Sequence, residues 1–351
     1  MDRETRDMLL ETADRFFTER AGKEIVNGVE KGVWPKDLWK EIEEMGLPLI
    51  AVPEDKGGAG GTLGDMLAVM RLAGSHAVPV PLAETALANL LVSAAGGKPA
   101  TGPSTLALGE LSLQGGRVSG KVALVPFAGV AERFVSIVTA GGKSTLVVVA
   151  REAAKIEDAP SHAGEPYGTV TFDNPPCEFA EISPVSAERA VELAALMRAM
   201  QMAGAADKVL ATAVEYCKQR VQFGRPISTF QAIQHMLAEL ASHVAATIAS
   251  AEAAARDADE GGLADGGRFS IAAAKSQTSE FAQRISAIAH QSMGAMGFTH
   301  EHILHHYTRR LWVWRRDFGS ETYWGEKIGT AFAKAGPQAL WPSLTASRYA
   351  S

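Results

Sequence analysis

Apolar residues recur at helical spacing toward both ends of this chain, and short β-branched runs lie between them. An apolar stripe at Met8, Leu9, Ala13, Phe16 and Phe17 predicts an amphipathic helix near the start. From about residue 101 to 182 the pattern changes to short runs rich in valine, threonine and isoleucine, separated by glycine, asparagine and proline. Such runs predict a small β-barrel or β-meander. The chain therefore reads as helical, then β, then helical again.

This pattern predicts three domains in a mainly α fold with a small β-domain. We place an N-terminal α-helical domain at residues 1–103, a middle β-domain at 104–182 and a C-terminal helical bundle at 183–351. Within the first long alanine-rich helix of the bundle, Gly204 marks a place where another helix can approach closely.

Composition narrows the class of protein. The 351 residues are 46% hydrophobic and 21% charged, with a formal net charge of −6, which suits a globular protein and argues against a general nucleic-acid binder. No apolar run approaches the roughly 20 residues that span a bilayer, and the first residues lack a secretory pattern. We expect a cytoplasmic protein that uses neither a membrane nor a nucleic acid. Cys177 and Cys217 have no metal-like spacing and are expected to be free thiols.

The stretch RVQFGRPISTFQAIQ, residues 220–234, interrupts two long helical patterns. Pro226 cannot continue the first helix, and Gly224 can adopt backbone angles that other residues avoid. Ser228 or Thr229 is expected to cap the helix that follows. The break is therefore a defined connection between two helices.

Polar and aromatic side chains gather around this break. Arg220 and Arg225 bring cations, Phe223 an aromatic ring, and Gln222 and Gln231 amides, close to a helix N-terminus that favours anions. These groups suit a flat, phosphorylated ligand. Many helix hairpins carry glycine, proline and arginine without any ligand, so the chemistry alone leaves both interpretations open.

The stretch YCKQRVQFGRPISTFQAIQHMLAEL, residues 216–240, resembles the C-terminal helical domain of the acyl-CoA dehydrogenases, flavoproteins that oxidise acyl thioesters between the α and β carbons. Residues 38–61, LWKEIEEMGLPLIAVPEDKGGAGG, are similar to the N-terminal helical domain of that family. The resemblance implies that the fold ends in a four-helix bundle and that the cofactor is FAD. It also implies that the first stretch crosses a subunit interface to a neighbour's FAD, with Arg220, Gln222, Phe223, Phe230 and Gln231 as the contacts.

A second stretch, HQSMGAMGFTHEHILHHYTRR at residues 290–310, has two glycines between helical patterns. It resembles the family segment that lies against the adenine and pyrophosphate of a neighbour's FAD. By position, Gln291, Gly294 and Ala295 inherit that contact. The two stretches agree with the family in order and in spacing.

Four histidines in this stretch, His300, His302, His305 and His306, raise the question of a metal. His302 and His306 stand at i,i+4 spacing, which can put two imidazoles on one helix face. No glutamate follows His302 as in the metalloprotease motif, and histidine clusters at helix surfaces and interfaces are common. We expect no metal.

Acyl-CoA dehydrogenation needs a carboxylate that removes the α-proton while hydride passes to the flavin. The resemblance places this glutamate just before a glycine near the C-terminus, where this chain has Phe318 and Gly319. In a second subset of the family the glutamate lies early in the long helix, and here that position is Ala194. The family's acyl-CoA contact reads ELAA, residues 192–195, in which Glu192 is only a weak candidate for the base.

Two acids adjoin the vacated position. Asp317 and Glu321 are the candidate catalytic residues that this chain itself offers. The alternative is that both carboxylates are solvated or paired with Arg315 and Arg316, and this alternative is favoured. The middle segment also lacks the family's Gly-Ser-Asp loop and contains no tryptophan, so we expect weak FAD binding by the chain alone.

These departures resemble the non-catalytic chains of heteromeric bacterial acyl-CoA dehydrogenases, notably those acting on sterol side chains. The leading hypothesis is a subunit that completes the FAD site of a partner chain carrying the glutamate, in an α2β2-like tetramer that acts on an acyl-CoA. Electrons would pass to electron-transfer flavoprotein or another acceptor. The alternatives are a self-sufficient homo-oligomeric dehydrogenase that uses Asp317 or Glu321, and a flavin-free structural or binding member of the family.

Overall fold

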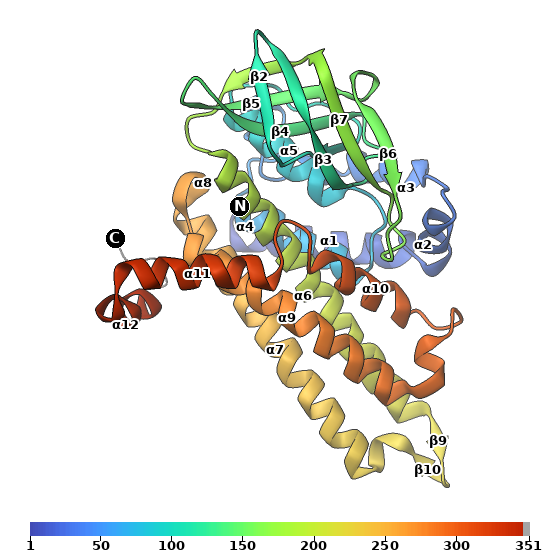
Figure 1. Cartoon of the computed structure of the whole chain (residues 1–351). Helices are drawn as coiled ribbons and strands as arrows, with labels where there is room; N and C mark the ends of the chain where they lie inside the picture. Colours follow the sequence, from blue (N-terminus) through green and yellow to red (C-terminus); the bar gives the residue numbers. More distant parts are fainter. Residues whose placement is uncertain (347–351) are drawn as a thin grey trace. The chain divides into compact units, whose positions relative to one another are not determined.

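Helices form the first and last parts of the chain and strands form its middle, as the computed structural model describes for residues 1–346 (Figure 1). This arrangement confirms the predicted mainly helical fold with a small β-domain. The N-terminal elements are α1 (Arg3–Arg20), α2 (Lys23–Glu30), α3 (Lys36–Glu44), η1 (Leu47–Leu49), η2 (Glu54–Lys56), α4 (Leu63–Ser75) and α5 (Leu82–Ala94).

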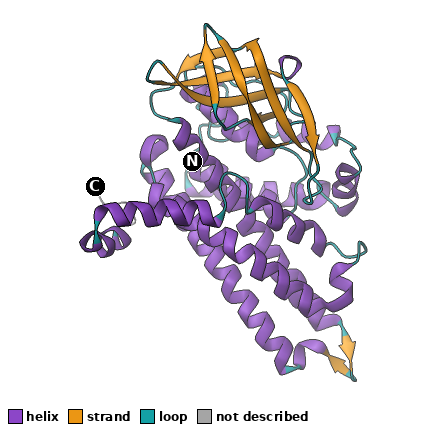
Figure 2. Cartoon of the chain, in the orientation of Figure 1, coloured by secondary structure: helices purple, strands orange, loops and turns teal. Residues whose placement is uncertain are grey.

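The middle of the chain forms two four-stranded sheets, seen as orange arrows in Figure 2. Their orders are β1-β4-β5-β8 and β2-β3-β7-β6, and all pairs are antiparallel except β1 with β4. The strands are β1 (Ser104–Leu106), β2 (Leu111–Gln114), β3 (Arg117–Pro126), β4 (Arg133–Ala140), β5 (Lys143–Ala150), β6 (Lys155–Ala159), β7 (Tyr167–Pro176) and β8 (Glu178–Glu181), with a 3₁₀ turn η3 (Arg151–Ala153).

An apolar core joins the two sheets, because residues from both contribute to one buried cluster. The rings of Phe134 on β4 and Phe172 on β7 meet edge-on, with centroids 5.9 Å apart. Helix α5 is tied to β1 through Thr85, whose hydroxyl donates to the Ser104 carbonyl and accepts from the Ser104 amide, each at 3.0 Å. The β-branched runs in the sequence thus become strands buried on their shared face.

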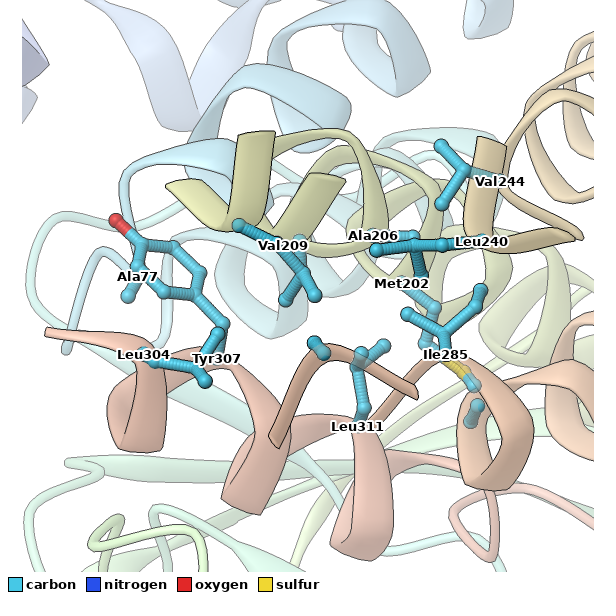
Figure 3. Close-up of a cluster of buried hydrophobic side chains, with 14 of the residues drawn as sticks. Ala77, Met202, Ala206, Val209, Leu240, Val244, Ile285, Leu304, Tyr307 and Leu311 are labelled. Atoms are coloured by element: carbon cyan, nitrogen blue, oxygen red, sulfur yellow. The ribbon is translucent and has the colours of Figure 1, made fainter. Parts of the chain in front are cut away.

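The C-terminal part is a bundle of long helices. Its elements are α6 (Ala187–Gln219), β9 (Val221–Gln222), β10 (Arg225–Pro226), η4 (Ile227–Thr229), α7 (Gln231–Glu260), α8 (Gly262–Asp265), α9 (Arg268–Met293), η5 (Gly294–Phe298), α10 (Leu304–Trp314), α11 (Glu321–Ala335) and α12 (Pro337–Thr345). Figure 3 shows the core of this bundle, in which Val209 of α6, Leu240 of α7, Ile285 of α9 and Leu311 of α10 belong to one buried cluster.

The described chain divides into two compact units. One holds residues 1–70, 79–194 and 258–266, and the other holds residues 71–78, 195–257 and the described residues from Gly267 onward. The predicted three-domain boundaries at 103 and 182 stay a prediction. Among the helices of residues 1–346, none has both the length and the apolar composition that crossing a membrane requires.

Gly204 lies where α6 meets the end of α4, as the sequence predicted. A Cβ added to Gly204 would lie 1.9 Å from the carbonyl oxygen of Arg71, and one added to Gly74 would lie 2.1 Å from that of Gln201. Both clashes involve backbone atoms, which cannot swing away as the end of a long side chain can. The two glycines therefore set the distance between the helices.

Gly204→Ala is expected to destabilise the protein by about 1–3 kcal/mol or more, because the added methyl forces two packed backbones apart. Gly329→Ala on α11 is the matched control: Gly329 is exposed and a Cβ there meets nothing within 4 Å. That control should stabilise the helix by roughly 0.5–1 kcal/mol. Urea unfolding of both variants provides the measurement, and equal stability would contradict the close approach.

Candidate functional site

The break between α6 and α7 is a two-stranded hairpin with a two-residue turn. Gln222 pairs with Arg225 and Val221 with Pro226. The turn residues Phe223 and Gly224 have φ of +54° and +80°. Positive φ at both central positions is typical of the turn that matches strand twist in short hairpins, although phenylalanine rarely adopts it. The hairpin thus holds a bulky residue in a conformation that usually belongs to glycine or asparagine.

The expected helix cap at Ser228 or Thr229 is wrong. A 3₁₀ turn, η4, stands between the hairpin and α7. The Thr229 hydroxyl donates to the Pro226 carbonyl at 2.7 Å, and the Gln234 amide donates to the Ser228 carbonyl at 3.1 Å. The sequence offered the right residue types, but they close the turn rather than start the helix.

Aromatic and cationic side chains are exposed on this hairpin. Phe223 is 91% exposed, and its ring meets Phe230 edge-on at 6.1 Å. The guanidinium of Arg225 lies 4.3 Å from the centre of the Phe230 ring. Arg220, Gln222 and Gln231 are exposed as well. Four of the five predicted contact residues of this stretch are therefore exposed, and the fifth, Phe230, is half-buried against Phe223 and Arg225.

The second predicted stretch begins where α9 ends. Gly294 has φ +59° and ψ −143°, a backbone conformation that is essentially restricted to glycine. Gln291, Gly294 and Ala295 are exposed, whereas Gly297 is buried against His290. The chain therefore turns sharply here and leaves a side-chain-free backbone accessible at Gly294.

The two stretches lie at the same end of the bundle. The thiol of Cys217 on α6 is 3.7 Å from the carbonyl oxygen of Ser292 on α9, three residues before Arg220 and one after Gln291. Tyr216 also meets His302 edge-on at 6.1 Å. The guanidinium and amides here suit a pyrophosphate, and Phe223 and the bare backbone at Gly294 suit a flat ring system. These residues fit the expected dinucleotide.

Asp317 is engaged by a buried arginine. Its carboxylate oxygen lies 3.1 Å from Nε of Arg198, with the side chains 8% and 1% exposed. The same guanidinium lies 5.2 Å from the centre of the Trp314 ring and 5.6 Å from that of Phe318. Two rings, the Asp317 carboxylate and the Gln201 amide oxygen thus lie against the Arg198 guanidinium, so Asp317 is ion-paired in the interior of the bundle.

Glu321 is engaged by a different arginine. Arg315 forms an ion pair with it at the start of α11. Partial burial is the largest single influence on this carboxyl and raises its pKa, but the hydrogen bonds from Arg315 and from the backbone amide of Glu321, together with the charges of Arg315 and Lys275, outweigh burial and leave the pKa of Glu321 lowered. Both acids beside Phe318 are therefore ion-paired: Arg315 pairs with Glu321, and Arg198 pairs with Asp317. That neither acid acts as the catalytic base stays a prediction.

A lysine that the sequence analysis did not single out lies beneath this loop. Lys275 on α9 is fully buried, and its Nζ donates to the carbonyls of Gly319 at 2.8 Å, Arg315 at 3.0 Å and Trp314 at 3.4 Å. The Ser279 hydroxyl accepts from the same nitrogen at 2.9 Å. Burial lowers the pKa of Lys275 to about 7, and Asp317 opposes that shift.

The acid of the early long helix is also structural. Glu192 is fully buried and lies 3.2 Å from Nη1 of Arg189. Arg189 donates in addition to the carbonyls of Gly266 at 2.7 Å and Leu263 at 2.9 Å. Ala194, the other position at which the family can carry its base, is buried and has no polar atom in its side chain.

The histidines of the second stretch make local hydrogen bonds. Nδ1 of His305 lies 2.7 Å from the His302 carbonyl oxygen, and Nδ1 of His302 accepts from the Leu304 amide at 3.2 Å. These contacts close the turn that leads into α10. That no metal binds here stays a prediction.

Sequence reasoning missed Lys275 and Arg198 because it weighed acids as candidates for the base. A signal existed: each cation stands inside an alanine-rich or methionine-rich run, LMRAMQM and IAAAKSQ. Charges at the apolar phase of a helix are rarely buried without partners. Searching for such positions would have found both residues.

Comparison with known proteins identifies relatives along most of the chain. Residues 3–98 match the model of the acyl-CoA dehydrogenase N-terminal domain, and residues 185–323 match that of the C-terminal domain. Acyl-CoA dehydrogenase IpdE2 of Mycobacterium tuberculosis is 32% identical over 314 residues, which cover 88% of this chain and 91% of IpdE2. Acyl-CoA dehydrogenase FadE34 of the same organism is 34% identical over 338 residues, but the match spans 90% of this chain and only 45% of FadE34.

Solved structures share the fold. The Tcur3481-Tcur3483 steroid ACAD matches with a TM-score of 0.85 and 25% identity, covering 95% of this chain and 98% of that one. The ChsE4-ChsE5 complex from Mycobacterium tuberculosis matches with a TM-score of 0.83 and 20% identity, covering 95% and 98%.

Proposed function

Because the chain belongs to the acyl-CoA dehydrogenase family, a family of FAD-dependent oxidoreductases, we propose that it is the subunit that completes a partner's FAD site and leaves the base to that partner. One observation carries the proposal. Phe318 stands where the resemblance puts the glutamate, and the carboxylates beside it, Asp317 and Glu321, are bound by Arg198 and Arg315. Neither acid is free to take up a substrate proton.

The exposed end of the bundle supports the other half of the proposal. Arg220 and the amides of Gln222, Gln231 and Gln291 would hold the pyrophosphate of FAD, and Gly294 would let the backbone approach it. When bound, FAD supplies the hydride acceptor. The residues of this chain bind and orient it, and the exposed ring of Phe223 adds apolar surface that reaches the neighbouring subunit.

The substrate we propose is an acyl-CoA with a bulky, sterol-derived acyl group. Support for this substrate comes from the Tcur3481-Tcur3483 match, whose name calls it a steroid ACAD.

The proposed partner is a second acyl-CoA dehydrogenase chain in an α2β2-like tetramer. The paired names of both matched structures support this partner. The proposed electron acceptor is electron-transfer flavoprotein or another carrier.

The first test is flavin content. The chain purified alone is expected to bind FAD weakly, because its middle segment, residues 101–182, lacks a tryptophan and the ring-holding loop that the resemblance would supply. Co-expression with a neighbouring family chain should yield a complex with flavin absorbance and the mass of a heterotetramer. Stoichiometric FAD in the homomeric preparation would favour the self-sufficient enzyme, and a colourless complex would favour the flavin-free member.

Arg220→Ala is expected to weaken FAD binding to the complex at least tenfold, because a charge-assisted hydrogen bond contributes about 1.5–3 kcal/mol. Arg284→Ala is the matched control, since Arg284 is an exposed arginine of the same bundle that pairs with Glu280 on its own helix. Flavin titration measures the affinity, and circular dichroism should show unchanged helix content in both variants. Equal affinity in the two variants would argue against the role of Arg220.

Asp317→Asn and Glu321→Gln should each leave turnover of the assembled complex within a few-fold of the parent. Loss of a general base commonly lowers the rate about 10²- to 10⁴-fold, so an essential acid would be evident. The two variants should differ in stability: Asp317→Asn breaks a buried ion pair, which costs on the order of 3 kcal/mol, whereas Glu321→Gln loses a more exposed one. Melting temperature is measured beside the rate. A large rate loss with unchanged stability and flavin content would show that this chain supplies its own base.

A further inference from the structure

The backbone of the loop between α10 and α11 is held in an unusual conformation. Phe318 has φ +54° and Gly319 has φ +102°. A positive φ is unfavourable for a phenylalanine, and such a conformation persists only where the surroundings enforce it. A Cβ on Gly319 would lie 2.6 Å from Nε1 of Trp324. The direction of the side chain at residue 318 is therefore set by whatever holds this loop.

Hydrogen bonds from Lys275 reach the end of α10 and the second residue of the strained pair. Trp314 is the last residue of α10 and Arg315 follows it, whereas the Gly319 carbonyl lies two residues before α11 begins at Glu321. The Ser279 hydroxyl adds a bond to the Arg315 carbonyl at 3.0 Å. Between these anchors, Nε1 of Trp324 donates to the Phe318 carbonyl at 3.1 Å. One amino group thus links the end of α10 to the residues that lead into α11.

Charge placement explains how a lysine is accommodated there. The charged groups that face Lys275 are Arg198 on α6, Arg315 after α10, Asp317 in the loop and Glu321 on α11. Two cations and two anions leave the lysine without a net local counter-charge. A net counter-charge is therefore not what holds this lysine in place. Its hydrogen bonds to the loop carbonyls are the contacts that a methionine at this position could not make.

We propose that Lys275 is a positioning residue that fixes the loop of residues 315–320 and thereby aims the side chain of residue 318. The inference rests on the proposed function for its relevance to the acyl-CoA dehydrogenase site, where residue 318 takes the place of the base. It extends the proposed function by naming the group that fixes the direction of the residue 318 side chain. We call the hydrogen bonds from Lys275 to the carbonyls of Trp314, Arg315 and Gly319 the frame of this loop. Because these bonds hold the backbone, they do not depend on which side chain stands at position 318.

The test compares Lys275→Met with Lys334→Met, which removes an exposed lysine of α11. Amide hydrogen exchange is followed in the purified full chain without flavin, so the outcome does not depend on cofactor or partner. Lys275→Met is expected to speed exchange of residues 315–320 at least tenfold, because several hydrogen bonds to this loop are lost together. Exchange in the middle of α7 should change less than twofold, and Lys334→Met should match the parent. Loop exchange within twofold of the parent in Lys275→Met would overturn the proposal.

A pH series tests whether opening of the loop exposes the Lys275 amino group to water. The pKa of Lys275 is about 7 in the folded chain and about 10.5 when the residue is solvated, so opening the loop takes up a proton between these values. Protection of the loop should therefore be flat below pH 7 and rise by up to about tenfold per pH unit above it, after correction for intrinsic exchange rates. The same rise should be absent in Lys275→Met. A parent loop whose protection does not change between pH 7 and 9 would contradict the buried amino group.

Ser279→Ala keeps the test decisive if Lys275→Met does not fold. It retains the lysine and removes the hydroxyl that accepts from Lys275 and donates to the Arg315 carbonyl. Exchange should rise several-fold in residues 315–320 alone. Unchanged loop exchange in this variant would likewise count against the frame.

Discussion

Buried cations that bind the carbonyl ends of helices organise this protein at two places. Backbone carbonyls in the last turn of a helix have no partner within the helix, and when a helix ends inside the protein some other donor must reach them. Lys275 supplies that donor to the end of α10, and Arg189 supplies it to the glycine-rich segment after α7. Each cation thereby decides the path of a connection, and the loop that follows α10 is the one at which the family's chemistry is expected.

This constraint links the fold to the function we propose. The loop needs the hydrogen bonds from Lys275 whether or not it carries a base. Without them, buried carbonyls at the end of α10 would lack hydrogen-bond donors. Asp317 forms an ion pair with Arg198, and Glu321 forms one with Arg315. From the sequence alone both acids are candidates for the base, but in the structure each is ion-paired with a neighbouring arginine. The residues that we propose as FAD contacts lie at the other end of α6 and α9, where Arg220 and Gly294 are exposed.

Much of the fold could be predicted from the sequence because hydrophobic periodicity reports local structure directly. The helical stripe at Phe17, the β-branched runs before Ile182 and the close approach at Gly204 all follow from properties of the residues themselves. The hairpin at Phe223 could not be predicted, because its turn places a phenylalanine where local preference favours asparagine or glycine. Lys275 was missed for a related reason: its role depends on carbonyls more than thirty residues away, and no local pattern encodes them.

The pairing of Arg198 with Asp317 has a consequence for substitution at position 318. One guanidinium already binds a carboxylate and lies against the rings of Trp314 and Phe318. A glutamate placed at position 318 would remove one of those rings and bring a second carboxylate to the same cation, and two carboxylates at short range repel each other. An acid at position 318 is therefore accommodated more easily if Asp317 is replaced by an uncharged residue at the same time, so the residues of this loop constrain one another.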